Sequence, residues 1–207
     1  MLLQLNGAQL SYTTYGQGAP VLIMAGSSAT TQCNWGSWLS GVATIGQLIA
    51  YAPAHTADQA QTPSAIDNEI DRQLMLAESL RRHLDYQSLF LFGHGYGGFL
   101  AQEYALRYGQ HLAGVILCAT MPALDYRDES ANRLHRLTTP TLVVAGRLDW
   151  YTPPIQAERL HTALPASRLV IFDQSGHFPF ATEPAKFSKV VSRWIAEQMQ
   201  HQNGASQ

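Results

Sequence analysis

Residues 92–109 read Phe-Gly-His-Gly-Tyr-Gly-Gly-Phe-Leu-Ala-Gln-Glu-Tyr-Ala-Leu-Arg-Tyr-Gly, and this stretch decides the fold class. The run that leads into it, Ser88–Phe92, is mostly apolar and predicts a buried strand. Phe99–Tyr108 predicts a helix, which Gly109 ends. A strand, a glycine-rich turn and a helix in this order are typical of α/β proteins, which bind ligands where their parallel strands end.

Strands and helices alternate along the rest of the chain. Leu2–Asn6 and Ala8–Tyr15 meet at Asn6-Gly7, which predicts an antiparallel hairpin. Apolar runs predict the following strands: Val21–Met24, Leu48–Ala52, Ser88–Phe92, Val115–Ala119, Thr141–Ala145 and Leu169–Phe172. Periodic apolar residues predict the following helices: Trp38–Thr44, 64–84, Phe99–Tyr108, Pro154–Leu164 and Pro184–Met199. We therefore expect one α/β domain over residues 1–200, with a mainly parallel sheet flanked by helices, and a disordered polar tail at 201–207.

The composition excludes several classes of protein. The 207 residues are 46% hydrophobic and 14% charged, a balance that excludes an intrinsically disordered chain. The formal net charge of −2 offers no basic surface, so we expect no nucleic-acid partner. No apolar run is long enough to span a membrane and no signal peptide is visible, so we expect a cytoplasmic protein with no membrane partner.

The cysteines and histidines do not form a recognisable metal or disulfide pattern. Cys33 and Cys118 lie far apart in the sequence, and Cys118 falls in an apolar run that predicts a buried strand position. Nothing in the spacing supports Cys33 as a nucleophile. The eight histidines show no metal-ligand spacing, so we expect no metal site and no cofactor.

The glycine cluster Gly93–Gly98 has two interpretations. It matches the G-x-G-x-x-G turn of dinucleotide-binding proteins, but that pattern also needs an acidic residue at the end of the next strand, and Val115–Thr120 contains none. The competing interpretation is the nucleophile elbow G-x-S-x-G, a sharp turn that lifts its central side chain above the edge of the sheet. The central residue here is Gly95, so the serine nucleophile is absent.

The elbow and its helix resemble those of α/β-hydrolases, and among these the proline iminopeptidase and esterase branch. Two later motifs resemble the same family: Gly-Arg-Leu-Asp-Trp-Tyr-Thr-Pro at 146–153 is similar to its acid loop, and Ser-Gly-His-Phe-Pro-Phe-Ala-Thr-Glu-Pro at 175–184 to its histidine loop. The resemblance implies that Asp149 and His177 are the acid and the histidine of a catalytic triad whose nucleophile position is Gly95. It also implies an α/β-hydrolase fold, with the hairpin at one edge of the sheet.

The chain also departs from the family pattern. Ala25-Gly26 stands where the family usually has His-Gly, and the resemblance then implies an oxyanion hole at Ser27 and Tyr96. Residues 51–58 contain no glycine, although the family has a glycine-rich turn there. The family's lid domain lies between residues 120 and 140, where only a short segment stands, so we expect the lid domain to be absent.

These features leave three hypotheses about function. The first is a hydrolase-like protein, divergent or not dependent on serine, that binds a small molecule of carbonyl or ester character or a protein partner. The second is an enzyme whose His177–Asp149 dyad performs general-base chemistry on a small carbonyl substrate, as in some relatives with this fold. The third is an active esterase or peptidase whose serine was replaced by engineering. Trp150 and Phe178 are expected either to bind the substrate or to be ordinary core residues.

The N-terminal hairpin predicts an association surface. Residues 1–15 contain no charged side chain and no proline, two features with which proteins protect a sheet edge. A missing lid would also leave apolar surface at the mouth of the site. We therefore expect a homodimer or a heterologous complex.

Overall fold

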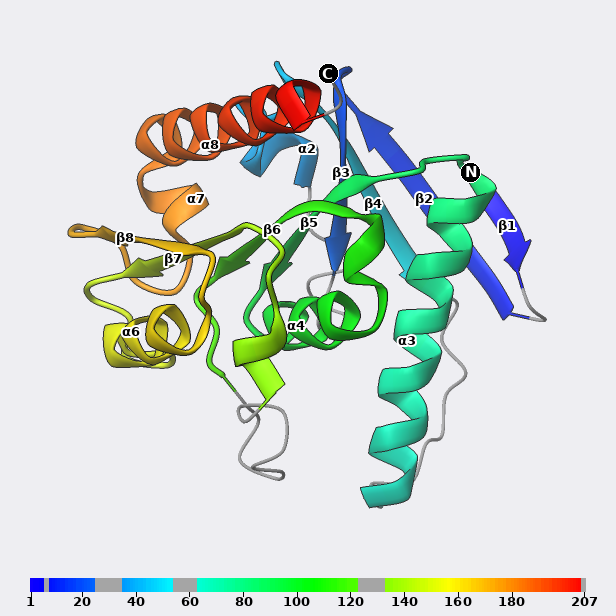
Figure 1. Ribbon diagram of the computed structural model, residues 1–207, viewed down its shortest axis with the longest axis horizontal. Coiled ribbons are helices and arrows are strands. Elements are labelled where there is room, and N and C mark those ends of the chain that lie inside the picture. The colour runs from blue at the N-terminus through cyan, green and yellow to red at the C-terminus, as the bar shows by residue number, and fades with distance from the viewer. Residues whose placement is uncertain (6–7, 25–34, 54–62, 123–132, 206–207) are drawn as a thin grey trace.

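The computed structural model describes residues 1–5, 8–24, 35–53, 63–122 and 133–205 (Figure 1). The strands are β1 (Leu2–Leu5), β2 (Ala8–Tyr15), β3 (Ala19–Met24), β4 (Gly46–Pro53), β5 (Leu89–His94), β6 (Leu112–Cys118), β7 (Thr141–Gly146) and β8 (Ser167–Phe172). The helices are α2 (Trp35–Trp38), α3 (Pro63–His83), α4 (Tyr96–Tyr108), α6 (Pro154–Ala163), α7 (Pro179–Thr182) and α8 (Pro184–Ala205). Two short 3₁₀ helices, η1 (Gly109–His111) and η2 (Leu134–Arg136), complete the described elements.

The strands form one sheet of eight, in the order β1-β2-β4-β3-β5-β6-β7-β8. β2 is antiparallel to both β1 and β4, whereas every neighbouring pair from β4 to β8 is parallel. The structure therefore confirms a mainly parallel α/β sheet with an antiparallel hairpin at one edge. The register pairs Met24 with Gly93 and His94 with Cys118, so the carboxyl ends of β3, β5 and β6 lie level.

Helices cover both faces of the sheet, so the central strands are buried on both sides (Figure 1). On one face α3, α4 and α6 pack through residues such as Leu80, Leu100 and Leu160, and on the other α2 and α8 pack through Trp35 and Trp194. All six residues of β5 and all seven of β6 are buried. Continuous apolar runs of this kind are typical of parallel sheets covered on both faces.

Two elements differ from the sequence prediction. The helix predicted at Trp38–Thr44 lies earlier, as the four-residue α2, because Trp35 is buried against Phe92 and Phe180 and fixes the helical turn there. The tail predicted to be disordered from residue 201 continues α8 through Ala205. No proline interrupts that segment, so nothing in the sequence forces the helix to end at Met199.

The segment where a lid domain would be inserted is described only in part. Residues 133–140 form η2 and an extended connection into β7. The remainder of the predicted lid-free segment, residues 123–132, lies outside the described residues.

Candidate active site

Gly95 occupies the sharp turn between β5 and α4. Its φ of 56° and ψ of −122° lie in a region that non-glycine residues rarely adopt. The Gly95 N–H donates to the Cys118 carbonyl at 3.0 Å, and Thr120 Oγ1 donates to the Gly95 carbonyl at 2.7 Å. The end of β6 and the residues that follow it therefore hold this turn through two hydrogen bonds, in the conformation that the elbow interpretation requires.

Gly93 is required for close backbone packing, whereas Gly95 adopts a positive φ. A Cβ atom at Gly93 would lie 2.4 Å from the carbonyl oxygen of Gly97, which is too close for any side chain. The absence of a side chain allows the first turn of α4 to pack directly on the end of β5. The glycine cluster thus serves close backbone packing around the turn.

Asp149 follows β7 and is held by its own loop. The N–H groups of Tyr151 and Thr152 donate to Oδ1 at 2.9 Å each, and the Thr152 hydroxyl donates to Oδ2 at 2.5 Å. Burial disfavours the charged carboxylate, but the hydrogen bonds from Thr152 and His177 outweigh it, so the pKa of Asp149 is lowered. The side chain is therefore a buried and ionised acceptor at neutral pH.

His177 lies between Asp149 and Gly95. Its Nδ1 is 2.8 Å from Asp149 Oδ2 and 3.2 Å from the Thr152 hydroxyl oxygen. An ionised Asp149 can only accept a hydrogen bond, so His177 Nδ1–H is the donor. Nε2 therefore carries the free lone pair in the neutral ring. An ideal Cβ built on Gly95 would be 3.5 Å from that Nε2. His177 Nε2 therefore faces the position that the first side-chain atom of a residue 95 would occupy.

The acid loop and the histidine loop are tied to each other. Leu148 N–H donates to the Ser175 carbonyl at 2.9 Å, and the Ser175 hydroxyl donates to Glu183 Oε2 at 2.6 Å. The same Glu183 oxygen accepts the N–H of Gln174 at 3.2 Å. This fixes the backbone on the N-terminal side of His177.

His94 fixes the other side of the same loop. Its Nε2–H donates to the His177 carbonyl at 2.8 Å, and the two imidazole centroids are 4.6 Å apart. The side chain is only 4% exposed, and burial lowers the pKa of His94 to about 4. His94 is therefore neutral at physiological pH and acts as a positioning residue for His177.

The comparisons with known proteins agree with this geometry. A family model described as alpha/beta hydrolase fold matches residues 57–135, and one described as TAP-like protein, Abhydrolase_4, matches residues 105–205. The chain belongs to the α/β-hydrolase superfamily.

Relatives and solved structures of this superfamily match different shares of the chain. A pimeloyl-[acyl-carrier protein] methyl ester esterase of Vibrio vulnificus is 46% identical over 76 residues, 37% of this chain and 27% of that protein. A putative carbamate hydrolase of Pseudomonas syringae is 29% identical over 133 residues, 62% of this chain and 51% of that protein. The chain thus matches about a quarter to a half of these relatives.

Two solved structures share the fold over nearly the whole chain. A meta-cleavage product hydrolase from Pseudomonas fluorescens has a TM-score of 0.81 at 15% identity, covering 95% of this chain and 97% of that one. A thermophilic esterase from Thermogutta terrifontis has a TM-score of 0.80 at 18% identity, covering 96% and 98%. At these identities the likeness concerns the α/β-hydrolase fold alone.

Aromatic side chains surround the His177–Asp149 dyad. The rings of Tyr151 and Phe178 each have their centroids 5.1 Å from that of His177, on different loops. Phe178 is 43% exposed and so borders the site. Trp150 is 87% exposed and contacts Tyr151 at 6.1 Å between centroids, which places it one layer farther out. Neither Trp150 nor Phe178 is a core residue.

The predicted oxyanion hole is described on one side only. Tyr96 is the first residue of α4, and its N–H has no partner four residues earlier within the helix. Its ring stacks on Phe99 at 5.8 Å. Ser27, the other predicted member, lies outside the described residues. The sequence analysis missed Thr152; the spacing Asp-x-x-Thr after a buried strand is the signal that could have indicated it.

Within the described ranges, no group of three or more His, Cys, Asp or Glu side chains could hold a metal ion, and no helix is long and apolar enough to cross a membrane. Cys118 is fully buried in β6, as predicted, and burial raises the pKa of its thiol. Cys33 lies outside the described residues.

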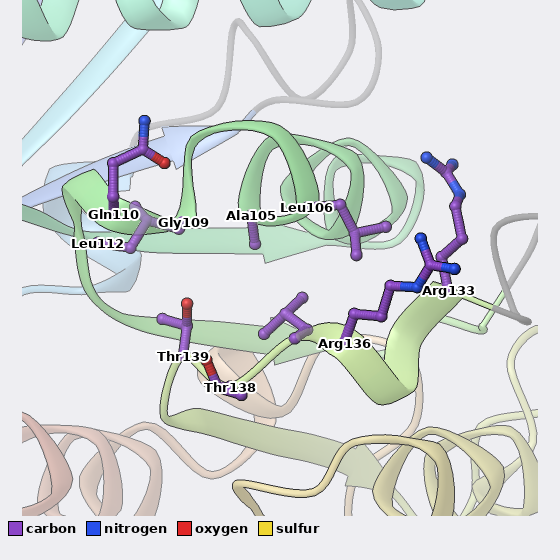
Figure 2. A pocket seen from close by; sticks show the side chains of 10 residues that line it. Ala105, Leu106, Gly109, Gln110, Leu112, Arg133, Arg136, Thr138 and Thr139 are labelled. Carbon is purple, nitrogen blue, oxygen red and sulfur yellow. The ribbon is translucent and has the colours of Figure 1, made fainter.

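A pocket of about 580 Å³ lies away from the dyad (Figure 2). It opens between α4 with η1 on one side and η2 on the other, bordered by residues such as Leu106, Arg136 and Thr139 (Figure 2). This pocket lies beside the N-terminal ends of β6 and β7, whereas Gly95 and Asp149 follow the carboxyl ends of β5 and β7. Because these strands are parallel, the pocket and the dyad lie at opposite ends of the sheet.

Proposed function

We propose that this α/β hydrolase is a member that does not depend on serine, and that its His177–Asp149 dyad is a general base acting on a small carbonyl or ester substrate. The observation that carries the proposal is the 3.5 Å between His177 Nε2 and the Cβ position of Gly95. The base, its orienting carboxylate and the rigid turn have the arrangement of a triad, and Gly95 supplies no nucleophilic atom.

In the proposed reaction the attacking atom is the oxygen of a water molecule beside Gly95. His177 Nε2 accepts a proton from this water while the oxygen forms a bond to the substrate carbonyl carbon. The N–H of Tyr96, at the N-terminus of α4, donates to the oxygen that becomes negative, together with the predicted contribution of Ser27. When the bond to the leaving group breaks, Nε2–H returns the proton to the departing oxygen.

Asp149 has two tasks in this scheme. It selects the tautomer of His177 in which Nε2 is free to accept a proton, and its negative charge stabilises the imidazolium that forms. The bonds from Thr152 and from the loop N–H groups keep the carboxylate ionised during that step. His94 keeps the imidazole in place without competing for the proton, because its own pKa is about 4.

The surroundings favour an apolar acyl group on the substrate. Tyr151 and Phe178 present aromatic rings next to His177, and both are at least partly exposed. Aromatic faces bind apolar groups and exclude water from the reacting atoms. The named activities of the relatives, on methyl esters and carbamates, belong to the same carbonyl chemistry.

The test measures release of nitrophenol from short nitrophenyl esters by the wild type and by His177→Ala and Asp149→Asn. A positioned general base contributes about 10²–10⁴-fold, so we expect a loss of that order in His177→Ala. The matched control is His83→Ala, an exposed histidine in the last turn of α3, which should retain full activity. Equal turnover in the wild type and His177→Ala would refute the proposal.

The absence of an acyl-enzyme is a separate expectation. We expect the wild type to show no burst of nitrophenol in the first turnover and no labelling by fluorophosphonate probes, because Gly95 has no side chain to acylate. Stoichiometric labelling at any residue would show that a different nucleophile operates.

A further inference from the structure

The pocket between α4, η1 and η2 has the size of a small-molecule site. Its volume is about 580 Å³, and pockets that bind small organic ligands span about 300–1,000 Å³. It lies at the opposite end of the sheet from the His177–Asp149 dyad, so the proposed hydrolysis does not use it. Every residue that lines it belongs to the described part of the chain.

Two arginines lie at one end of this pocket (Figure 2). Arg133 directly precedes the 3₁₀ helix η2, and Arg136 is the last residue of that helix. Side chains three positions apart lie above one another in a 3₁₀ helix, so both guanidinium groups reach the same end of the pocket. Among the described residues that line the pocket, none is Asp or Glu. This end of the pocket therefore attracts a negative charge.

Glu103 of α4 compensates the charge of one arginine. Arg133 Nη2 donates to both carboxylate oxygens of Glu103, at 3.0 and 3.1 Å. Arg136 is exposed and has no ion-pair partner among the residues that the structure describes. These three groups together leave one positive charge, which matches an anion with a single negative charge. The planar guanidinium also fits the two oxygens of a carboxylate.

Apolar side chains separate the arginines from a polar end of the pocket. Ala105 and Leu106 of α4 lie between the two ends, and Gln110 and Thr139 border the far end (Figure 2). α4 ends at Tyr108, beside that far end, and the carbonyl groups at the C-terminus of a helix disfavour an anion. A bound anion therefore places its charged group at the arginines and its apolar part along α4.

The connection that forms the opposite wall is fixed before any ligand binds. Thr141 Oγ1 donates to the Thr139 carbonyl at 2.9 Å, and the Val115 N–H donates to the Pro140 carbonyl at 2.9 Å. A Cβ at Gly109 would lie 3.2 Å from Thr139 Oγ1, so the absence of a side chain allows this hydroxyl to approach η1 closely. Because this wall is already in place, binding requires little reorganisation of the protein.

We infer that this pocket binds a short-chain monocarboxylate, with the carboxylate on Arg136 and Arg133 and the alkyl chain on Leu106 and Ala105. The site is separate from the dyad, so the inference does not depend on the proposed function. Inorganic phosphate matches the pocket less well, because it has no apolar part to contact the leucine.

The experiment measures the binding of hexanoate to the full chain by isothermal titration calorimetry at pH 7. Acetate keeps the charge and loses most of the chain, and hexanamide keeps the chain and loses the charge. A fully buried methylene contributes about fourfold to affinity, so hexanoate should bind about tenfold or more tightly than acetate or phosphate. Hexanamide should bind about 10–100-fold more weakly than hexanoate, since it makes no charge-assisted hydrogen bond.

Two arginine variants test the position of the site. Arg136→Gln should weaken hexanoate binding by about 10–100-fold, because the charged hydrogen-bond donor is lost. The matched control is Arg159→Gln on α6, since Arg159 is also exposed and also lacks an ion-pair partner among the described residues. This control should bind hexanoate as the wild type does. Thermal unfolding shows whether both variants are folded.

A third variant tests the apolar part of the pocket. Leu106 is half-buried and lines the pocket, so Leu106→Gln keeps the size of the side chain and removes its apolar surface. The variant should reduce the preference for hexanoate over acetate and leave the affinity for acetate unchanged. An unchanged preference in a folded Leu106→Gln would overturn the assignment of the chain to this wall.

The outcomes separate this inference from the proposed function. Equal hexanoate affinity in the wild type and Arg136→Gln would overturn the inference, as would an equal loss in both arginine variants. Acetate, phosphate or hexanamide that binds as tightly as hexanoate would overturn the class of ligand. Loss of hexanoate binding in His177→Ala would place the ligand at the dyad and also overturn the inference. Ester turnover that does not require His177 would refute the proposed function alone.

Discussion

Replacing Gly95 by serine adds a hydroxyl oxygen that could act as the nucleophile. The Cβ of the new side chain would lie 3.5 Å from His177 Nε2, so its hydroxyl can be placed within the roughly 2.6–3.2 Å of a nucleophile–base hydrogen bond. The orienting Asp149 is already bonded to the other ring nitrogen. We therefore expect Gly95→Ser to acquire esterase activity through an acyl-enzyme.

The expected gain follows from two opposing factors. The serine of a complete triad contributes on the order of 10⁶-fold, as in the subtilisin variants. An oxyanion donor that does not operate costs about 10²–10³-fold, and we count one such loss because the loop at Ala25-Gly26 departs from the family pattern. A gain of about 10³–10⁴-fold over Gly95→Ala remains after this loss.

The same substitution should lower stability. A non-glycine residue at a φ of 56° costs about 1–3 kcal/mol, which corresponds to a decrease of roughly 2–12 °C in Tm for a chain of this length. Gly95→Ala carries the same backbone strain without a nucleophile and is therefore the control for both effects. The assay combines thermal unfolding with nitrophenyl ester kinetics. A folded Gly95→Ser that is no faster than Gly95→Ala would refute the geometric reasoning.

Three further predictions concern the surroundings of the site and the sheet edge. Burial lowers the pKa of His94 to about 4 from 6.5, so as the pH falls the unfolded chain binds a proton at this residue before the folded protein does. Urea unfolding should therefore show that the free energy of unfolding decreases by about 3 kcal/mol between pH 6.5 and 4. Carboxylates whose pKa is lowered, such as Glu78 from 4.5 and Asp149 from 3.8, lose stability at the acid end of that window, so His94→Asn should remove the part of the dependence above about pH 5. Thr152→Val should cost about 1–3 kcal/mol in unfolding experiments and reduce the His177-dependent rate, which Thr152→Ser should restore. Leu2 is 67% exposed on the edge strand β1, and we expect this edge to form a dimer contact. Light scattering should show a dimer for the wild type and a monomer for Leu2→Lys. A monomeric wild type would contradict this prediction.

The parts of the fold that local patterns determine could be predicted from the sequence. The apolar runs of the parallel strands and the Asn6-Gly7 signal between two alternating strands carry their own physical signature, and the observed strands lie where these patterns place them. The position of α2 could not be predicted in this way. It depends on Trp35 packing against Phe92 and Phe180, which are far away in the sequence.

In the candidate site, too, local motifs could be predicted from the sequence and long-range contacts could not. Gly95, Asp149 and His177 are recognisable because each stands in a loop motif directly after a strand. The supporting contacts to His177 are not: Thr152 lies 3.2 Å from His177 Nδ1 across 25 positions of the chain, and His94 bonds the His177 carbonyl across 83 positions. Contacts across such separations depend on the sheet register and have no local pattern in the sequence.

Mass spectrometry of the intact protein during turnover tests the central claim most directly. The wild type is mixed with excess nitrophenyl butyrate, quenched in acid while nitrophenol is being released, and weighed beside Gly95→Ser. General-base catalysis by His177 without a covalent intermediate predicts an unmodified mass for the wild type and a butyryl adduct for the variant. A butyryl adduct on the wild-type protein at a level that accounts for its turnover would contradict the account.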